Sequence, residues 1–283
     1  MLEPSNPSGN PSGNPSSVPS GNPENTHLLG TTPETILETR NLSKSFGAVQ
    51  AVRNVNWSVK RGEVCALLGD NGAGKSTLIK LIAGAILPSS GEIWVRGSRA
   101  QINGPSDALN LGIAPVYQDL ALVEGRNVIQ NMFLGSELTH GPLNLFLDHA
   151  RMALETERVL GEIRSRIPSA REVVRKLSGG QRQAVAIART LIRGGQIIIM
   201  DEPTAALGVE QTREVLQLIE NLRSQGRTVV LITHNMSQVF QVADQVSVMF
   251  RGEMIGTKRV KDTNQEEVIS MIVGTKREAM GAA

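Results

Sequence analysis

The sequence lacks several features that mark common classes of protein. It contains a single cysteine, so no disulfide bond can form within the chain. Aromatic residues make up only 3% of the chain and the net charge is +2, which argues against the stacking surfaces and clustered positive charge of nucleic-acid-binding proteins. No apolar run approaches the length that spans a bilayer, and the N-terminus has no apolar signal core. We therefore expect no nucleic-acid partner, and we expect another chain to hold this one wherever it works at a membrane.

The beginning of the chain is rich in proline, glycine, serine and asparagine. A tetrad repeats in NPSGNPSGNPS at residues 6–16, and SGNP recurs at residues 20–23. This composition cannot bury enough apolar surface to offset the entropy lost on ordering. We expect residues 1–34 to form a disordered tail, with a specific binding motif there as the alternative. A single domain is expected over residues 35–275.

The most informative stretch is GDNGAGKST at residues 69–77. A short apolar run at residues 64–68 precedes it, and a helix-like apolar run at residues 78–83 follows it. Strand, glycine-rich loop, lysine, hydroxyl and helix form the layout of a phosphate-binding loop. The alternative is a glycine turn that only joins the strand to the helix.

The residue types in this stretch suit the binding of phosphate. Gly69, Gly72 and Gly74 can take backbone conformations with positive φ and let the chain close around an anion. The N–H groups of the loop and the start of the following helix then point at the phosphates. Lys75 would reach the β- and γ-phosphates, and the hydroxyl of Ser76 would bind Mg²⁺. The stretch predicts a nucleotide site.

Apolar runs alternate with helical patterns through the later part of the chain. The runs that predict strands occupy residues 113–117, 197–200, 228–232 and 246–250. The helical patterns that alternate with them occupy residues 184–192, 210–224 and 236–243. Such alternation predicts an α/β fold with a mostly parallel sheet that is covered on both faces. Ligands of such a sheet bind at the carboxyl ends of its strands.

Two other regions differ from this alternation. Runs of alternating apolar and polar residues near residues 36–39, 55–59 and 93–95 predict an antiparallel β-layer beside the core. Residues 119–180 carry helical patterns, and the longer one, residues 148–167, ends before a proline. Its apolar side chains at near-helical spacing include Ala150, Leu154, Leu160 and Ile163. We expect a helical subdomain over residues 119–180.

Polar residues follow directly after three of the predicted strands, as the phosphate-binding loop follows a fourth. Asp201 can supply an oxygen to Mg²⁺ alongside Ser76, and Gln118 could add a neutral oxygen to the metal or to the attacking water. Glu202 is then free to act as the general base, and His234 could donate a hydrogen bond to the γ-phosphate. Taken singly, each could be an ordinary loop or turn residue. Because the strands belong to one sheet, we expect all of these groups at one edge.

These motifs, together with LSGGQ at residues 177–181, occur in the order found in ABC-type ATPase subunits, and the chain resembles that family over about residues 35–260. The resemblance implies a P-loop NTPase (RecA-like) core with an antiparallel β-layer and a helical subdomain. It also implies that two copies pack head to tail and sandwich two ATP molecules. The LSGGQ sequence of one copy would then meet the γ-phosphate held by residues 69–77 of the other. Two glycine amides, a hydroxyl and a helix start suit such a contact.

The resemblance assigns roles to individual residues. Catalytic roles are implied for Glu202, His234 and Gln118, and Mg²⁺ ligation for Ser76, Gln118 and Asp201. Phe46 matches the aromatic residue that stacks on adenine in the family, although a single core phenylalanine is a fair alternative. The implied ATP contacts are Phe46, Gly69, Asp70, Asn71, Gly72, Ala73, Gly74, Lys75, Ser76, Thr77, Ser178, Gly179, Gly180 and Gln181.

Within the family the chain looks most similar to ATP-binding subunits of bacterial monosaccharide importers of the ribose, xylose and fructose type. The supporting sequences are SFGAVQAV, VYQDLALV, NVIQNMFLG and EPTAALGV, at residues 45–52, 116–123, 127–135 and 202–209. The resemblance implies transmembrane permease subunits as partners, a periplasmic sugar-binding protein as an indirect partner, and a location at the cytoplasmic face of the inner membrane. Another transporter class and a soluble non-transport ABC ATPase are the alternatives.

One position departs from the family pattern. Most members carry an acidic residue in the loop after the catalytic glutamate, where this chain has Gly208. That loop usually touches the opposite nucleotide site, so this departure bears on the coupling between the two sites.

Overall fold

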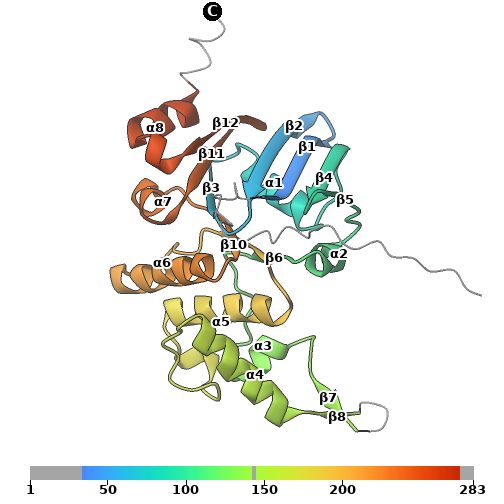
Figure 1. Ribbon diagram of the computed structural model, residues 1–283, viewed down its shortest axis with the longest axis vertical. Coiled ribbons are helices and arrows are strands. Elements are labelled where there is room, and N and C mark those ends of the chain that lie inside the picture. The colour runs from blue at the N-terminus through green and yellow to red at the C-terminus, as the bar shows by residue number, and fades with distance from the viewer. Residues whose placement is uncertain (1–33, 142–144, 275–283) are drawn as a thin grey trace, which may run out of the picture. The chain divides into compact units, whose positions relative to one another are not determined.

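The computed structural model describes residues 34–141 and 145–274. The expected tail lies outside the described residues apart from Glu34. The described part contains a six-stranded sheet in the order β12-β11-β3-β10-β9-β6 and a four-stranded sheet in the order β2-β1-β4-β5 (Figure 1). The predicted fold class, a parallel sheet with an antiparallel layer and helices, is confirmed.

The six-stranded sheet is the centre of the domain. Its strands are β3 (Val64–Leu68), β6 (Ile113–Val116), β9 (Ile197–Asp201), β10 (Thr228–Ile232), β11 (Gln245–Phe250) and β12 (Glu253–Arg259). Neighbouring strands pair in parallel except for β12, which pairs antiparallel with β11 at one edge. β3 and β10 are buried along their whole length, which explains why they read as continuous apolar runs rather than alternating ones.

Successive residues of β3 point to opposite sides of this sheet and divide the core into two clusters. Cys65 and Leu67 lie in the cluster beneath the antiparallel sheet, whereas Ala66 and Leu68 lie in the cluster beneath the larger helices. The antiparallel side consists of β1 (Thr35–Phe46), β2 (Val49–Lys60), β4 (Ser90–Val95), β5 (Ser98–Ala100), α1 (Lys75–Ile82) and α2 (Pro105–Asn110).

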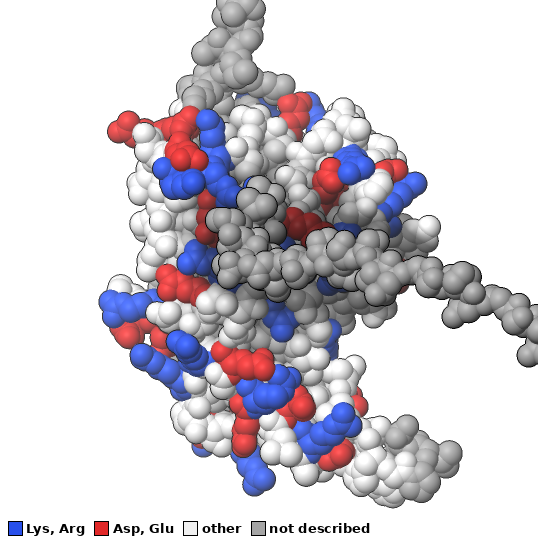
Figure 2. Space-filling view, in the orientation of Figure 1, with Lys and Arg blue, Asp and Glu red and all other residues white. Residues whose placement is uncertain are grey.

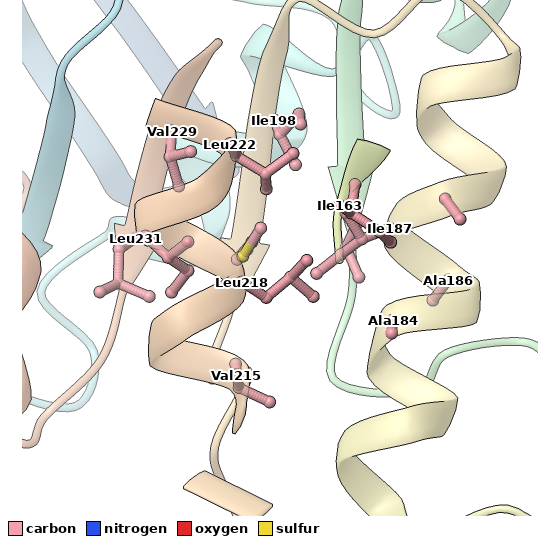
Figure 3. Packing of buried hydrophobic residues seen from close by; sticks show 14 of the residues in the cluster. Ile163, Ala184, Ala186, Ile187, Ile198, Val215, Leu218, Leu222, Val229 and Leu231 are labelled. Atoms are coloured by element: carbon pink, nitrogen blue, oxygen red, sulfur yellow. The ribbon is translucent and has the colours of Figure 1, made fainter. Parts of the chain in front are cut away.

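Helices cover the other side of the central sheet. They are α5 (Gly179–Ile192), α6 (Val209–Ser224), α7 (Met236–Val242) and α8 (Gln265–Val273). Val215, Leu218 and Leu222 of α6 share one buried cluster with Ile198 and Leu231 of the sheet (Figure 3). Complete burial of an aliphatic side chain of this size contributes about 1.5–3 kcal/mol. The side chains on this face of α6 therefore hold the helix on the sheet.

The remaining elements extend the helical side. They are α3 (Val128–Phe133), α4 (His149–Glu162), the hairpin of β7 (Thr139–His140) and β8 (Phe146–Leu147), and the short 3₁₀ helices η2 (Val174–Lys176) and η3 (Val260–Asp262). α5 packs against α3, α4 and α6 and also against β6, so it joins the predicted helical subdomain to the sheet (Figure 1). The exact bounds of that subdomain, residues 119–180, stay a prediction.

Two sequence predictions about helices were wrong in detail. The helix expected over residues 148–167 ends at Glu162, because Arg164 takes a left-handed conformation (φ 52°) that stops an α-helix. Its buried face is made by Met152, Thr156, Val159 and Leu160, whereas Leu154 is 68% exposed. The helix expected to begin at residue 184 begins at Gly179, so the two glycines of LSGGQ form its first turn.

On the face shown in Figure 2, acidic and basic side chains are interspersed. Among the charged residues of the described chain, Arg158 forms exposed ion pairs with Glu155 and Glu162 on α4. Exposed pairs of this kind contribute about 1 kcal/mol or less each, so the two apolar clusters hold the domain together. Within the described residues, none of the helices is both long and apolar enough to cross a membrane.

Candidate nucleotide site

Strand register brings four strand ends to one edge of the central sheet. Ile232 of β10 pairs with both Leu67 of β3 and Asp201 of β9, and Val116 of β6 pairs with Met200 of β9. The chain therefore leaves all four strands at nearly the same level. The predicted site residues that follow these ends within two positions are Gly69, Gln118, Glu202 and His234.

The phosphate-binding loop depends on two close backbone approaches. Gly69 has φ 150° and Gly74 has φ 101°. A Cβ atom at Gly69 would lie 2.3 Å from the carbonyl oxygen of Met249, and one at Gly74 would lie 2.4 Å from that of Ala51. Gly72 has φ 79°, but a Cβ atom there would meet nothing within 4 Å. The first and third glycines are thus required by space as well as by conformation.

Lys75 is the first residue of α1, and its side chain folds back into the loop. Its Nζ donates hydrogen bonds to the carbonyl oxygens of Gly69 at 2.7 Å and Asp70 at 3.0 Å. Burial lowers the pKa of the ammonium, and the nearby carboxylates of Glu202 and Asp201 act in the opposite direction. The ammonium therefore lies where the loop, β9 and the residue after β9 meet.

The other loop residues complete the start of α1. Asp70 accepts a hydrogen bond from the backbone N–H of Asn71 at 2.7 Å, and its own carbonyl accepts one from Ala73 at 3.1 Å. Ser76 is exposed and Thr77 is half-buried in the first turn of the helix. Ser76 is accordingly accessible at the start of the helix.

Asp201 lies at the carboxyl end of β9 and is half-buried. Burial raises the pKa of its carboxyl, the neighbouring charge of Glu202 raises it further, and Lys75 and Lys80 lower it. Burial raises the pKa of Tyr117, and the charge of Asp201 raises it further, so Tyr117 lies near this carboxylate. The two lysines do not fully offset the effects of burial and of Glu202 on the pKa of Asp201. A further cation beside this carboxylate would therefore stabilise its ionised form.

Glu202 and His234 form a pair at the sheet edge. Glu202 has a left-handed backbone (φ 50°), and its N–H donates to the carbonyl of Ile232 at 2.9 Å. Its Oε1 lies 2.9 Å from Nδ1 of His234, in a side-chain hydrogen bond. The side chain of His234 is 82% exposed and that of Glu202 is 21% exposed. A non-glycine residue held at positive φ costs about 1–3 kcal/mol and is typical of functional sites.

The residues of LSGGQ form the N-terminus of α5. The backbone N–H of Gln181 donates to Oγ of Ser178 at 3.2 Å, and the N–H of Ser178 donates to Oε1 of Gln181 at 3.0 Å, a capping box. The Gln181 amide also donates to the carbonyl of Arg166. Among the described residues, these bonds tie the segment to itself and to Arg166, not to the phosphate-binding loop of the same chain.

The two glycines of this segment lie close to neighbouring side chains. A Cβ atom at Gly179 would meet Leu207 at 2.4 Å, and one at Gly180 would meet Glu214 at 2.7 Å. The segment is therefore packed against the start of α6. Gly208, the position that departs from the family pattern, is exposed and caps the same helix.

The last two predicted residues are both exposed. Phe46 is the final residue of β1 and is 50% exposed, so it is no core phenylalanine. Gln118 follows β6 and Tyr117. Sequence reasoning missed Tyr117 as a neighbour of Asp201, although its position directly after an apolar strand was a usable signal. It also missed Lys44, whose ammonium lies over the ring of Phe46.

Comparison with known proteins gives a family. A family model described as ABC transporter matches residues 52–205. The chain is 46% identical over 237 residues to the xylose/arabinose import ATP-binding protein XylG of Sulfolobus acidocaldarius, covering 84% of this chain and 93% of that protein. It is 41% identical over 257 residues to the fructose import ATP-binding protein FrcA of Rhizobium meliloti, covering 88% and 99%.

A third relative is longer. The chain is 41% identical over 239 residues to the ribose import ATP-binding protein RbsA of Yersinia pestis, covering 84% of this chain and 46% of that protein. The chain thus spans about half the length of the ribose relative.

Solved structures agree with the sequence comparison. The ADP conformation of an ATP-binding cassette of an ABC transporter superposes with a TM-score of 0.73 at 27% identity, covering 86% of this chain and 96% of that one. A dimeric cassette in a post-hydrolysis state, bound to ADP and phosphate, superposes with a TM-score of 0.66 at 25% identity, covering 81% and 100%. With the phosphate-binding loop and the Asp201–Glu202 strand end in place, the chain belongs to the ABC transporter family, as an ATP-binding cassette.

Proposed function

We propose that this cassette is the ATP-hydrolysing subunit of an importer that takes up a monosaccharide through a separate membrane permease. The observation that carries the proposal is the convergence of Lys75, Asp201 and the Glu202–His234 pair at one sheet edge. The import of sugars is supported by the named relatives, which are xylose/arabinose, fructose and ribose import ATP-binding proteins.

Binding of ATP follows from the loop. Its backbone N–H groups and the N-terminus of α1 present partial positive charge to the phosphates. Lys75 exchanges the carbonyls of Gly69 and Asp70 for the β- and γ-phosphate oxygens. Asn71, Ala73 and the other loop residues contribute through their backbone, and Thr77 through the first turn of the helix.

A divalent cation fits the same place. The described residues contain no cluster of three or more His, Cys, Asp or Glu side chains that could hold a metal alone. Mg²⁺ suits a site of few protein oxygens completed by water and phosphate, which matches the exposed Ser76 hydroxyl, the carboxylate of Asp201 and the amide oxygen of Gln118. When bound, it neutralises the charge of the phosphates.

Glu202 is the general base of hydrolysis. Its carboxylate is fixed by the hydrogen bond to His234 and by the backbone bond to Ile232. One carboxylate oxygen accepts from the histidine, and the other can accept the proton of an attacking water. His234, which is exposed, orients this carboxylate through Nδ1–H before nucleotide binds. Because a neutral imidazole carries a single N–H, donation to the γ-phosphate would replace the hydrogen bond to Glu202.

The second half of each site comes from another copy of the chain. Because Oγ of Ser178 accepts the capping bond, its O–H remains available to donate to a phosphate. Because Gly179 and Gly180 have no side chains, they do not shield the backbone N–H groups of the first turn from a ligand. Two copies packed head to tail therefore enclose two ATP molecules. The permease binds this dimer at the cytoplasmic face of the membrane and receives sugar from a periplasmic binding protein.

Thermal unfolding with and without Mg-ATP tests the nucleotide site. At a ligand concentration a hundredfold above Kd, binding stabilises the folded chain by about 2.7 kcal/mol, or about 5–10 °C for a domain of this size. Lys75→Ala should abolish the shift, and the exposed Lys261→Ala should keep it. A shift of equal size in Lys75→Ala would refute the assignment of the loop.

The transport role is tested by co-sedimentation with membranes. The chain should sediment with membranes only when the permease is co-expressed.

A further inference from the structure

Phe46 lies at the end of the hairpin whose second strand contacts the phosphate-binding loop. Phe46 pairs with Val49 at the turn between β1 and β2, and β2 then carries Ala51 to the loop. The carbonyl of Ala51 lies so close to Gly74 that a Cβ atom there would be 2.4 Å away. The hairpin thus carries an exposed aromatic ring near the loop, and such a ring can stack on the base of a nucleotide whose phosphates occupy the loop.

Lys44 occupies one face of this ring. Its Nζ lies 5.2 Å from the centroid of Phe46, within the range of a cation–π contact. The same Nζ donates a hydrogen bond to the carbonyl oxygen of Leu87 at 2.7 Å. Leu87 lies a few residues after the end of α1, the helix that begins at Lys75. The ammonium is thus held between the ring and the segment that follows the phosphate-binding helix.

Two further hydrogen bonds fasten the end of β1 to that segment. The backbone N–H of Ser45 donates to Oγ of Ser89 at 3.1 Å, and the N–H of Ser89 donates to the carbonyl of Ser43 at 2.8 Å. The ring and the helix of the phosphate-binding loop are therefore connected to one short stretch of backbone. The backbone that carries Phe46 is thus hydrogen-bonded to the segment that follows the phosphate-binding helix.

We infer that Lys44 is a positioning residue for the nucleotide base: it covers one face of Phe46 and leaves the opposite face to stack on the purine of ATP. The inference rests on the proposed function, in which the loop holds ATP. The ammonium also offsets part of the negative charge on the ring face. This reduces the repulsion between the π electrons of the ring and those of a stacked base.

The alternative hypothesis is that Lys44 is one of several positive charges that attract the phosphates. The two hypotheses predict different results for a ligand that has phosphates but no base. A positioning role affects ATP and spares inorganic tripolyphosphate, because the effect passes through the ring. A general charge affects both ligands alike.

The experiment measures Kd for Mg-ATP and for Mg-tripolyphosphate by calorimetry in the full chain. The variants are Lys44→Met, Phe46→Ala, the double variant, Lys44→Arg and the control Lys261→Met. Lys44→Met should raise Kd for ATP about two- to fivefold, the size of an exposed cation–π contact, and leave tripolyphosphate unchanged. In the Phe46→Ala background the same substitution should have no further effect. Lys44→Arg should restore affinity, and Lys261→Met should resemble the wild type.

Three results would overturn the inference: no change in ATP affinity, equal weakening of both ligands, or a full effect of Lys44→Met without the Phe46 ring. If Lys44→Met unfolds, Lys44→Gln replaces it, since glutamine can still donate to the Leu87 carbonyl but carries no charge. Failure of the proposed function looks different, because the wild type itself would then fail to bind Mg-ATP.

Discussion

Replacement of Gly74 by alanine should destabilise the domain more than the same change at Gly72. Both glycines have positive φ, 101° and 79° respectively. A Cβ atom at Gly74 would lie 2.4 Å from the carbonyl oxygen of Ala51 and 3.2 Å from Cε of Met249, whereas at Gly72 it would meet nothing within 4 Å. The two variants therefore share the conformational cost and differ in the steric cost.

The two costs can be separated in size. An alanine in a left-handed conformation costs about 1–2 kcal/mol, and this is the whole cost expected for Gly72→Ala. Displacement of the backbone at Ala51 adds about 1–3 kcal/mol at Gly74, by analogy with overpacking of a core. For a domain of this size the added term lowers the melting temperature by about 2–12 °C relative to Gly72→Ala.

Calorimetric or circular-dichroism melting of both variants without nucleotide measures the difference. Because Ala51 belongs to the hairpin that carries Phe46, Gly74→Ala should also weaken ATP binding beyond the loss expected from the loop alone. Equal melting temperatures for the two alanine variants would refute the reasoning, since they would show that β2 does not confine Gly74.

Three further substitutions test the two carboxylates and the histidine beside them. Because burial and Glu202 raise the pKa of Asp201 above its usual 3.8, its ionised form destabilises the folded state at neutral pH, and this cost disappears as pH falls through the folded-state pKa. Asp201→Asn should therefore melt higher than the wild type at pH 7, by a margin that shrinks on acidification, while losing the Mg-dependent part of the ATP shift. Glu202→Gln should lower turnover about 10²–10⁴-fold and keep ATP affinity, with Glu220→Gln as an unaffected control. His234→Ala should also slow turnover more than it weakens binding, because it removes the partner that holds Glu202.

The fold could be read from the sequence where the apolar pattern was continuous. The runs at β3, β9 and β10 are buried on both faces, and each was located to within a residue. β12 and α8 were not predicted, because β12 lies at the sheet edge with most of its residues half-buried or exposed, which leaves little pattern. The six-residue α2 was too short to show helical periodicity.

The ends of helices were less predictable than their existence. Nothing in the residue type of Arg164 distinguishes a residue with φ 52° from a helical one, so the end of α4 was placed too late. At α5 the signal was present, since Ser178 and Gln181 are spaced as a capping box, but the helix was expected to begin only after LSGGQ. The same segment can begin the helix and bind a ligand, because the first backbone N–H groups of a helix point toward its N-terminus.

Site residues were predictable from their positions after strands, whereas their contacts were not. The hydrogen bond between Glu202 and His234 joins residues that follow different strands, and Glu202 also has a left-handed backbone; no sequence pattern reveals either feature. The contact between Lys44 and Phe46 joins residues two positions apart in a strand, where side chains share a face. That spacing was visible, but the exposure of the ring was not.

The central claim is that each ATP lies between the phosphate-binding loop of one copy and Ser178–Gln181 of another. Chains carrying Glu202→Gln with Lys75→Ala, and chains carrying Glu202→Gln with Ser178→Arg, should each remain monomeric in Mg-ATP. An equimolar mixture retains one complete site, because both defects fall in the same nucleotide site when the copies pack head to tail. Sedimentation velocity should therefore show that the mixture forms a dimer, and that this dimer forms only in Mg-ATP. A mixture that stays monomeric under conditions in which Glu202→Gln alone dimerises would contradict the shared site.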